Sequence, residues 1–152
     1  MKIIRDTREK DQHGWSFGEI ETIDQKLDTG DYTLVGLEDI ICIERKKSPS
    51  EVAINIGSDR VRFNKELERM KSFKLAYIIC EFSLESLISF PKGSNIPKSL
   101  QAKVRVGGKF LLSTLNSYKD KYNIDVLFCN NRDEAIEKSL ELFGYAQEIY
   151  GN

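Results

Sequence analysis

The chain has 152 residues, with 23 Lys and Arg, 24 Asp and Glu, one His and a formal net charge of −1. This length suits one domain with its own core, so we treat residues 1–152 as a single domain. The near-zero net charge argues against a protein that coats nucleic acid nonspecifically. It does not exclude a local basic surface that binds nucleic acid. No apolar run approaches the roughly 18–20 residues that cross a bilayer, so no membrane partner is expected.

The N-terminus and the cysteines point to the same compartment. The first residues, MKIIRD, become charged at once, which is not typical of a secretory signal. Cys42, Cys80 and Cys129 each lie inside an apolar run and lack metal-ligand spacing. We interpret them as reduced, buried thiols in a cytoplasmic protein.

The N-terminal third of the chain alternates short branched or apolar runs with polar connections, a pattern typical of strands and loops. We predict strands at residues 2–6, 19–25, 32–35 and 40–44, a polar loop at 7–17 and a turn at 36–39.

Helical signals begin at residue 48. Ser48 is a suitable N-cap, Pro49 fits the first helical position and Glu51 stands three residues after the cap. The next helix is predicted at residues 59–73, with Val61, Leu67 and Met70 toward the core and Phe63 at its flank. The remaining predictions are a strand at 75–81, a short helix at 84–90, a loop at 91–97, a broadly helical stretch at 100–122 broken at Gly107-Gly108, a strand at 124–129, and a final helix capped by Asn131 or Asp133 and running to about residue 149.

Strands that alternate with helices favour an α/β fold, with a mixed or parallel sheet and helices on both faces. Ligand sites in such sheets lie at the strand ends. Asp6, Asp31 and Glu44 all fall at or near predicted strand ends. A shared site is therefore expected there.

The segments around Asp31 and Glu44 carry the strongest chemical signal. Asp31 follows the turn that Gly30 permits, while Glu44 and Lys46 lie two residues apart on a strand and point to the same face. Two carboxylates and a lysine can hold a divalent cation beside a phosphodiester. Alone, Asp31 would be read as a turn residue and Glu44 as the solvated end of a strand. Glu44, however, emerges from an apolar run, where a charge is costly without a purpose.

Four short motifs follow one another in order along nearly the whole chain. The motifs are Asp6-Thr7-Arg8-Glu9, Gly30-Asp31-Tyr32, Glu44-Arg45-Lys46 and the Arg-Phe element within Arg60-Val61-Arg62-Phe63. Together they resemble the nuclease domain of the XPF-type structure-specific endonucleases, including the archaeal Hef nuclease, in the PD-(D/E)xK superfamily. The resemblance implies a restriction-endonuclease-like fold with a central mixed β-sheet flanked by helices, and a Mg²⁺- or Mn²⁺-dependent cut in branched, flap or fork DNA.

Roles for these residues follow from their chemistry. Asp31 and Glu44 are the expected first ligands of the metal, and Asp6 and Glu9 would supply a further ligand or bind a second ion. Lys46 would orient the attacking water or stabilise the transition state, and the resemblance implies that the Arg45 backbone carbonyl also ligates the metal. For DNA phosphates we expect contacts from Arg8, Arg45, Lys47, Arg60, Arg62 and Lys65.

One position departs from the family pattern. The family places an Asp a few residues beyond Glu-Arg-Lys, where this chain has Ser50 followed by Glu51. Glu51 either replaces the missing carboxylate as a metal ligand or serves only as the capping-box residue of the helix. The departure motivates a second hypothesis, that of a catalytically weak or inactive nuclease fold that binds DNA or an active subunit. A third reading is a restriction- or repair-type nuclease without a preference for branches.

Relatives of this family carry tandem helix-hairpin-helix modules after the nuclease domain, whereas the present sequence stops at Asn152. We therefore expect a stand-alone domain of phage or microbial origin, acting in the host cytoplasm or nucleoid in repair, recombination or replication. The resemblance suggests a homodimer formed through the C-terminal helices. The last helix has more apolar residues than one packed stripe needs, although an ordinary core helix explains them equally well.

Overall fold

The computed structural model describes residues 1–151, in which six strands form one sheet in the order β2-β1-β3-β4-β5-β6. The strands are β1 (Ile3–Arg5), β2 (Thr22–Asp24), β3 (Tyr32–Leu34), β4 (Ile41–Lys46), β5 (Leu75–Cys80) and β6 (Ile124–Phe128). The helices are the 3₁₀ helix η1 (Thr7–Gln12), α1 (Pro49–Ile56), α2 (Arg60–Met70), α3 (Leu84–Ser89), α4 (Lys98–Gln101), α5 (Gly108–Asn116), α6 (Tyr118–Tyr122) and α7 (Arg132–Tyr150).

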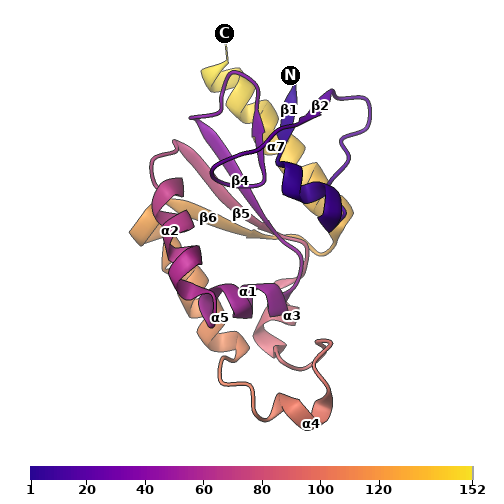
Figure 1. Cartoon of the computed structure of the whole chain (residues 1–152), viewed down its shortest axis with the longest axis vertical. Helices are drawn as coiled ribbons and strands as arrows, with labels where there is room; N and C mark the ends of the chain where they lie inside the picture. The colour runs from indigo at the N-terminus through magenta and orange to yellow at the C-terminus, as the bar shows by residue number, and fades with distance from the viewer. Residues whose placement is uncertain (152) are drawn as a thin grey trace.

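The sheet is mixed. Strand β3 runs antiparallel to both β1 and β4, whereas β4, β5 and β6 are parallel to one another and β2 is parallel to β1. Figure 1 shows β4 and β5 in the middle of the molecule, with α7 on one side and α1, α2 and α5 on the other. The predicted α/β class, with a central mixed sheet flanked by helices, is confirmed.

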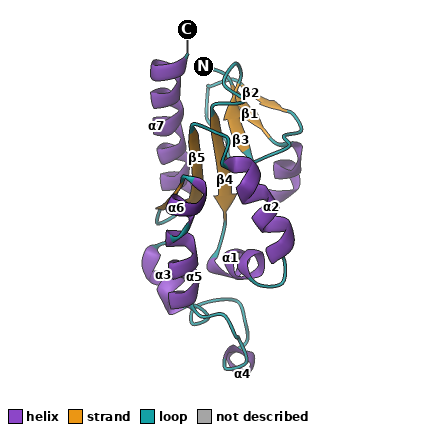
Figure 2. Ribbon diagram, turned by 90° about the vertical axis from the view of Figure 1, so that its left-hand side faces the viewer, coloured by secondary structure: helices purple, strands orange, loops and turns teal. Residues whose placement is uncertain are grey.

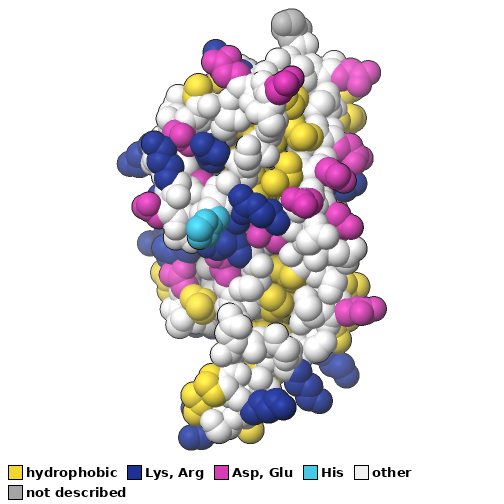
Figure 3. Space-filling model, turned by 90° about the vertical axis from the view of Figure 1, so that its right-hand side faces the viewer, with side chains coloured by type: hydrophobic (Ala, Val, Ile, Leu, Met, Phe, Trp, Pro, Cys, Tyr) yellow, Lys and Arg dark blue, Asp and Glu magenta, His cyan; other side chains and the backbone are white. Residues whose placement is uncertain are grey.

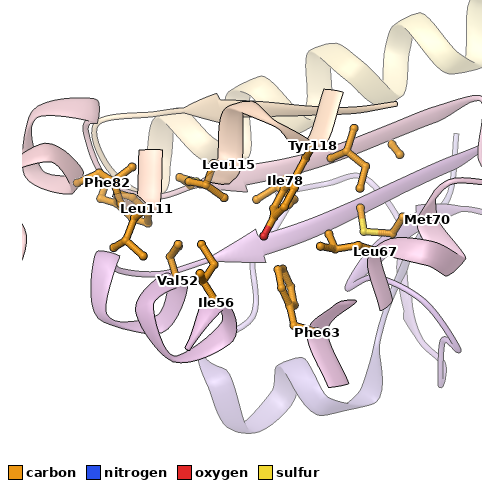
Figure 4. Packing of buried hydrophobic residues seen from close by; sticks show 14 of the residues in the cluster. Val52, Ile56, Phe63, Leu67, Met70, Ile78, Phe82, Leu111, Leu115 and Tyr118 are labelled. Atoms are coloured by element: carbon orange, nitrogen blue, oxygen red, sulfur yellow. The ribbon is translucent and has the colours of Figure 1, made fainter. Parts of the chain in front are cut away.

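Two hydrophobic clusters, one on each face of the sheet, explain the buried strands. One cluster joins α1, α2, α3, α5 and α6 to the sheet through residues such as Phe63, Leu67, Ile78, Leu111 and Leu115 (Figure 4). The other packs α7 and the segment that follows η1 against the opposite face. Strands covered on both faces carry continuous apolar sequence, as β4 and β5 do before the charged end of β4.

Local signals placed the helix starts correctly. The Ser48 hydroxyl accepts a hydrogen bond from the Glu51 N–H, with Pro49 in the first turn. The Asn131 side chain likewise caps α7 by accepting from the Glu134 N–H, so Asn131 rather than Asp133 is the cap.

One prediction about the helices holds with an addition, and another is wrong. The stretch 100–122 is helical with a break that ends at Gly107-Gly108, as predicted, and it is interrupted a second time before α6. The Gly107-Gly108 pair accounts for the first interruption, because Gly108 begins α5 against the backbone of α3, where a Cβ would lie 2.1 Å from the Leu87 carbonyl oxygen. Val61 was assigned to the core but is 70% exposed, whereas Phe63 is buried, because the inward stripe of α2 consists of Phe63, Glu66, Leu67 and Met70.

The connection between α3 and α5 projects from the body of the molecule. Figures 1 and 2 show α4 at the far end of this projection, well away from the sheet. We call residues 91–107 the α4 lobe. Within residues 1–151, no helix is long and apolar enough to cross a membrane.

Candidate active site

The antiparallel pairing of β3 with β4 brings Asp31 beside Glu44. Tyr32 pairs with Ile43, and the Asp31 N–H donates to the Ile43 carbonyl over 2.8 Å. Asp31 then turns its own carboxylate onto β4, where Oδ2 accepts the Arg45 N–H at 2.8 Å. Gly30 makes this approach possible with a φ of +78°, in the left-handed region that favours glycine.

Glu44 and Lys46 face the same side of β4, as their spacing predicts. Lys46 Nζ donates to Glu44 Oε2 over 3.0 Å and lies 4.6 Å from the centre of the Phe63 ring. Both side chains are buried. The other oxygen of Glu44, Oε1, is buried without a hydrogen-bond partner among the described residues. An unpartnered carboxylate oxygen is costly in a protein interior and is open to a ligand.

The electrostatics of these groups show a local excess of negative charge. Burial, opposed by Lys46 but reinforced by Glu66, raises the pKa of Glu44 to about 7. Burial together with the nearby charges of Glu44 and Glu9 raises the pKa of Asp31 well above its usual value. Burial alone would lower the pKa of Lys46, but Glu44 and Glu51 outweigh it and raise that pKa. The ammonium therefore stays charged while the two carboxylates resist ionising together.

The three side chains line a cavity of about 450 Å³ between the end of β4 and the helices α1 and α2. Three polar residues that sequence reasoning did not assign to the site, Gln12, Asn55 and Glu66, also line it. Glu66 Oε1 accepts the Gly30 N–H at 3.4 Å, and Asn55 Oδ1 is buried without a partner among the described residues. The available signal for Glu66 was its position in the stripe of Phe63, Leu67 and Met70, where a carboxylate would otherwise be out of place.

Glu9 and Arg45 also line the cavity, and they belong to a second, interlocked network. Arg45 donates from Nη1 to Glu9 Oε2 at 2.6 Å and from Nε to Glu81 Oε1 at 2.7 Å. The Tyr32 hydroxyl donates to the same Glu9 oxygen at 3.0 Å, and burial together with this carboxylate raises the pKa of Tyr32. The Arg45 guanidinium is thus buried and held by two carboxylates. Its placement does not fit the phosphate contact predicted for this side chain.

Asp6 lies outside the cavity. Its Oδ2 accepts hydrogen bonds from the Arg8 N–H and Nε, at 3.0 and 2.6 Å, and its Oδ1 accepts the Leu27 N–H at 2.7 Å. The carboxylate is fully buried and caps η1. The Asp6 N–H donates to the Asp31 carbonyl at 2.8 Å, so the two backbones are neighbours. The Asp6 carboxylate, however, does not line the cavity with Asp31 and Glu44 as the sequence predicted, because its oxygens bond Arg8 and Leu27.

The remaining predicted residues divide between the cavity and the open surface. Arg8, Lys47 and Arg62 line the cavity, while Arg60 and Lys65 are exposed on α2 outside it. Arg62 pairs with Asp59 through a 2.7 Å hydrogen bond. Figure 3 shows one face of the molecule on which Lys and Arg side chains gather around the single histidine at mid-height.

Ser50 and Glu51, where the chain departs from the expected pattern, lie on different sides of the start of α1. Glu51 lines the cavity with Asp31 and Glu44, whereas Ser50 faces a separate groove on the other side of the start of α1. Glu51 Oε1 accepts the Lys47 N–H at 3.0 Å. Glu51 thus supports the chain at the start of α1 and also lines the cavity. This position suits both of its predicted roles, the capping residue and the metal ligand.

The oxygen donors at the site suit a hard divalent cation. Among residues 1–151, no three His, Cys, Asp or Glu side chains are already drawn together as a complete ligand set. Mg²⁺ retains several waters and needs only one or two protein carboxylates. Asp31 and Glu44 supply that number, and the unpartnered Oε1 of Glu44 is an oxygen atom available to ligate the ion. The residues present therefore fit such an ion.

Comparisons with known proteins show the family and the fold of this chain. The ERCC4 domain family matches residues 5–141, which is most of the chain. The chain belongs to the ERCC4 domain family. A search of curated protein sequences gives no match.

Solved structures with a similar fold include two of XPF from Aeropyrum pernix. The first, described as a complex with DNA, has a TM-score of 0.67 at 17% identity and covers 97% of this chain and 65% of that chain. The second has a TM-score of 0.66 at 16% identity and covers 98% and 66%. The present chain thus spans about two thirds of the length of these XPF proteins. The XPF-type nuclease-domain fold that the motifs predicted for this ERCC4 domain is confirmed.

Proposed function

We propose that this ERCC4 domain is a divalent-metal-dependent DNA endonuclease that hydrolyses phosphodiester bonds in branched or flapped DNA during repair, recombination or replication. The observation that supports this most is the Asp31, Glu44 and Lys46 constellation in a polar cavity, with one Glu44 oxygen unpartnered. The DNA complex recorded for an XPF protein of the same fold supports the choice of substrate class.

Asp31 and Glu44 would hold Mg²⁺ or Mn²⁺ through carboxylate oxygens, with Glu51 and the Arg45 carbonyl as further candidates. Such an ion makes its bound water more acidic and offsets the charge that builds on a phosphate. Asp6 is a weaker candidate than the sequence suggested, because both of its carboxylate oxygens are already hydrogen bonded within the chain. Glu9 remains a candidate, because it lines the cavity and its hydrogen bonds from Arg45 and Tyr32 both end on Oε2.

Lys46 is fixed for an electrostatic role. Its ammonium is held by Glu44 and by the face of the Phe63 ring, so it enters the reaction already oriented. A preorganised cation stabilises the charge on a pentavalent phosphate without reorganising during the reaction. Arg8, Lys47 and Arg62 line the cavity and would contact phosphates near the scissile bond.

Cleavage of labelled flap, fork and plain duplex DNA in Mg²⁺ or Mn²⁺ tests the proposal. We expect Asp31→Asn and Glu44→Gln each to lower the cleavage rate by about 100-fold or more, since each removes transition-state stabilisation. Glu19→Gln, at an exposed position outside both the cavity and α7, is the matched control and should cut normally. Absence of cutting by the wild type, or normal cutting by both variants, contradicts the proposal. Equal cleavage rates on flap and duplex DNA would instead indicate a nuclease without a preference for branches.

A non-catalytic DNA-binding or dimerisation module is the second candidate. It is favoured by Ser50, which stands where the family has an acid and faces away from the cavity. Calorimetry with Mn²⁺ separates the two candidates. Binding that Glu44→Gln abolishes supports the nuclease, whereas DNA binding without any metal uptake supports the module.

We further propose that two copies associate through α7. Tyr145 and Ile149 on this helix are 50% and 54% exposed. Large apolar side chains in neighbouring turns of one helix form a surface that a second copy could cover.

A further inference from the structure

The α4 lobe carries charge of one sign. Glu85 and Asp120 are the nearest acidic residues on either side of it along the chain. Between them every charged side chain is a lysine or an arginine, although the whole chain has a net charge of −1. Those on the lobe and at its base are Lys92, Lys98, Lys103, Arg105 and Lys109, all exposed.

These basic side chains are not engaged within the fold. Among the described residues, none of the five forms an ion pair or a side-chain hydrogen bond, unlike Arg5, Arg45 and Arg62 elsewhere. Figure 3 shows dark blue side chains on the projecting lower end of this face and none of the colour of Asp and Glu there. The lobe thus presents unneutralised positive charge to solvent.

The lobe is tethered to the body at its base. The Gly108 N–H donates to the Phe90 carbonyl at 3.0 Å, which brings the two ends of the connection together. Ile96, Val104 and Val106 pack against the hydrophobic cluster of the body. Structureless connections beyond about 12–15 residues are uncommon in compact domains unless they have a function. This one contains only the short helix α4.

The lobe adjoins the candidate active site along the chain. A groove of about 890 Å³ separates the lobe from α1 and α3, and Ser48 and Ser50 line it on the α1 side. Lys47 and Glu51, directly before and after them, line the active-site cavity. The cavity and the groove therefore lie on either side of the start of α1. A long ligand that enters the cavity can continue over this point onto the lobe.

We propose that the α4 lobe is a second DNA-binding surface, which contacts the phosphate backbone of duplex DNA away from the cut. The inference rests on the proposed function in taking DNA as the ligand, but adds a surface outside the active site. Lysines and arginines without nearby acids bind phosphates. Residues 91–107 contain no aromatic side chain on which an unpaired base could stack. The lobe therefore suits the backbone of a duplex and reads no sequence.

The test measures binding without turnover, by fluorescence anisotropy of a fluorescein-labelled flap duplex in EDTA at several salt concentrations. The test variant combines Lys98→Gln, Lys103→Gln and Arg105→Gln. The control variant removes the same number of positive charges outside the lobe. Its substitutions are Lys26→Gln, Lys71→Gln and Lys121→Gln, all at exposed positions.

We expect the lobe variant to bind at least about tenfold more weakly, and its slope of log affinity against log salt to fall by about 2.7, since each lost phosphate contact removes about 0.9. The control should stay within about twofold of the wild type. Both variants should melt at the wild-type temperature, because every substituted residue is exposed. A lobe variant with wild-type affinity and slope overturns the inference, as does a control that weakens equally or a wild type that does not bind.

Cleavage assays on the same proteins separate this inference from the proposed function. A lobe variant that binds normally while the wild type cuts DNA refutes the lobe and leaves the nuclease intact. Lobe-dependent binding by a wild type that never cuts refutes the nuclease and leaves the lobe as a DNA contact.

Discussion

The buried carboxyl group of Glu44 lowers the stability of the folded protein. Its carboxyl group is buried, has one oxygen without a partner among the described residues, and has its pKa raised from 4.5 to about 7. An acid whose pKa is higher in the folded state destabilises the fold as pH rises from the unfolded to the folded value. Functional sites often retain such costs because the chemistry needs them.

Glu44→Gln should therefore stabilise the metal-free protein at alkaline pH. We expect its melting temperature to exceed that of the wild type at about pH 8, and the difference to shrink near pH 5, where Glu44 is protonated in the folded wild type. The gain should be on the order of 1 kcal/mol, because the substitution also takes from Lys46 its ion-pair partner. Thermal melts in EDTA measure it, with Glu148→Gln as the control. A variant less stable than the wild type at both pH values contradicts the assignment.

Gly30 has two separate reasons to be glycine. Its φ is +78°, and a Cβ there would lie 2.4 Å from Cys42 Sγ. Gly36 shares only the first reason, because its φ is +88° and a Cβ would meet nothing within 4 Å. Substitutions at Gly30 and Gly36 therefore distinguish the cost of the positive φ, which both share, from the cost of the close contact with Cys42, which only Gly30 has.

We expect Gly30→Ala to destabilise the protein by about 2–4 kcal/mol and Gly36→Ala by about 1 kcal/mol. The larger loss arises from the forced shift of Cys42 on β4, which would also displace Asp31 from Arg45. Urea unfolding of both variants tests this. Equal losses would mean that the contact with Cys42 contributes nothing.

At the scale of elements, Arg45 joins three parts of the fold. It lies on β4, and its guanidinium bonds Glu9 in η1 and Glu81 at the end of β5, with Trp15 stacked on Tyr32 beside it. The Arg45 guanidinium is buried and donates from Nε and Nη1 to these carboxylates. Arg45 therefore supports the site by fixing η1 against the sheet.

Arg45→Ala should cost about 3–5 kcal/mol of stability, since it leaves two buried carboxylates without their cation. The exposed pair of Arg62 with Asp59 predicts a loss below about 1 kcal/mol for Arg62→Ala. Arg45→Lys should recover part of the stability, because it keeps the charge but not the two-sided hydrogen bonding. Chemical denaturation measures all three. If Arg45→Ala unfolds like the wild type while binding DNA more weakly, the predicted phosphate contact is right and the structural role is wrong.

At the scale of the whole molecule, α1 and α2, which line the active-site cavity, pack on one face of the sheet, while α7 covers the other face (Figure 2). Association through α7 would thus leave the cavity and the lobe free. A dimer of this kind would display two sites, each with its own lobe.

Sedimentation velocity over a range of concentrations tests this dimer. We expect the wild type to shift toward twice the monomer mass as concentration rises, and the double variant Tyr145→Glu with Ile149→Glu to remain monomeric. Phe110→Glu is the matched control, because Phe110 is 58% exposed on α5. It should associate like the wild type. A wild type that stays monomeric, or a Phe110→Glu variant that alone loses association, contradicts the role of α7.

Sequence patterns predicted part of the site well and part of it poorly. Glu44 and Lys46 could be paired because strand periodicity alone sets their direction, and Asp31 could be added because it follows a glycine turn. Glu66 was missed, since helical periodicity assigns a residue to the inward stripe but does not say whether that stripe meets core or cleft at that point. Asp6 was assigned to the site because it lies near a strand end, but its oxygens bond Arg8 and Leu27 instead.

The sequence by itself determined the order of the motifs, the main strands, the cap of α1 and the family, because these depend on neighbours along the chain. The tertiary structure decided which charges meet. It placed Glu51 in the cavity and Ser50 outside it, gave Arg45 to Glu9 and Glu81, and set the basic α4 lobe apart from the body. Such contacts depend on strand register and helix packing, which bring together residues distant in sequence, and local patterns do not encode those distances.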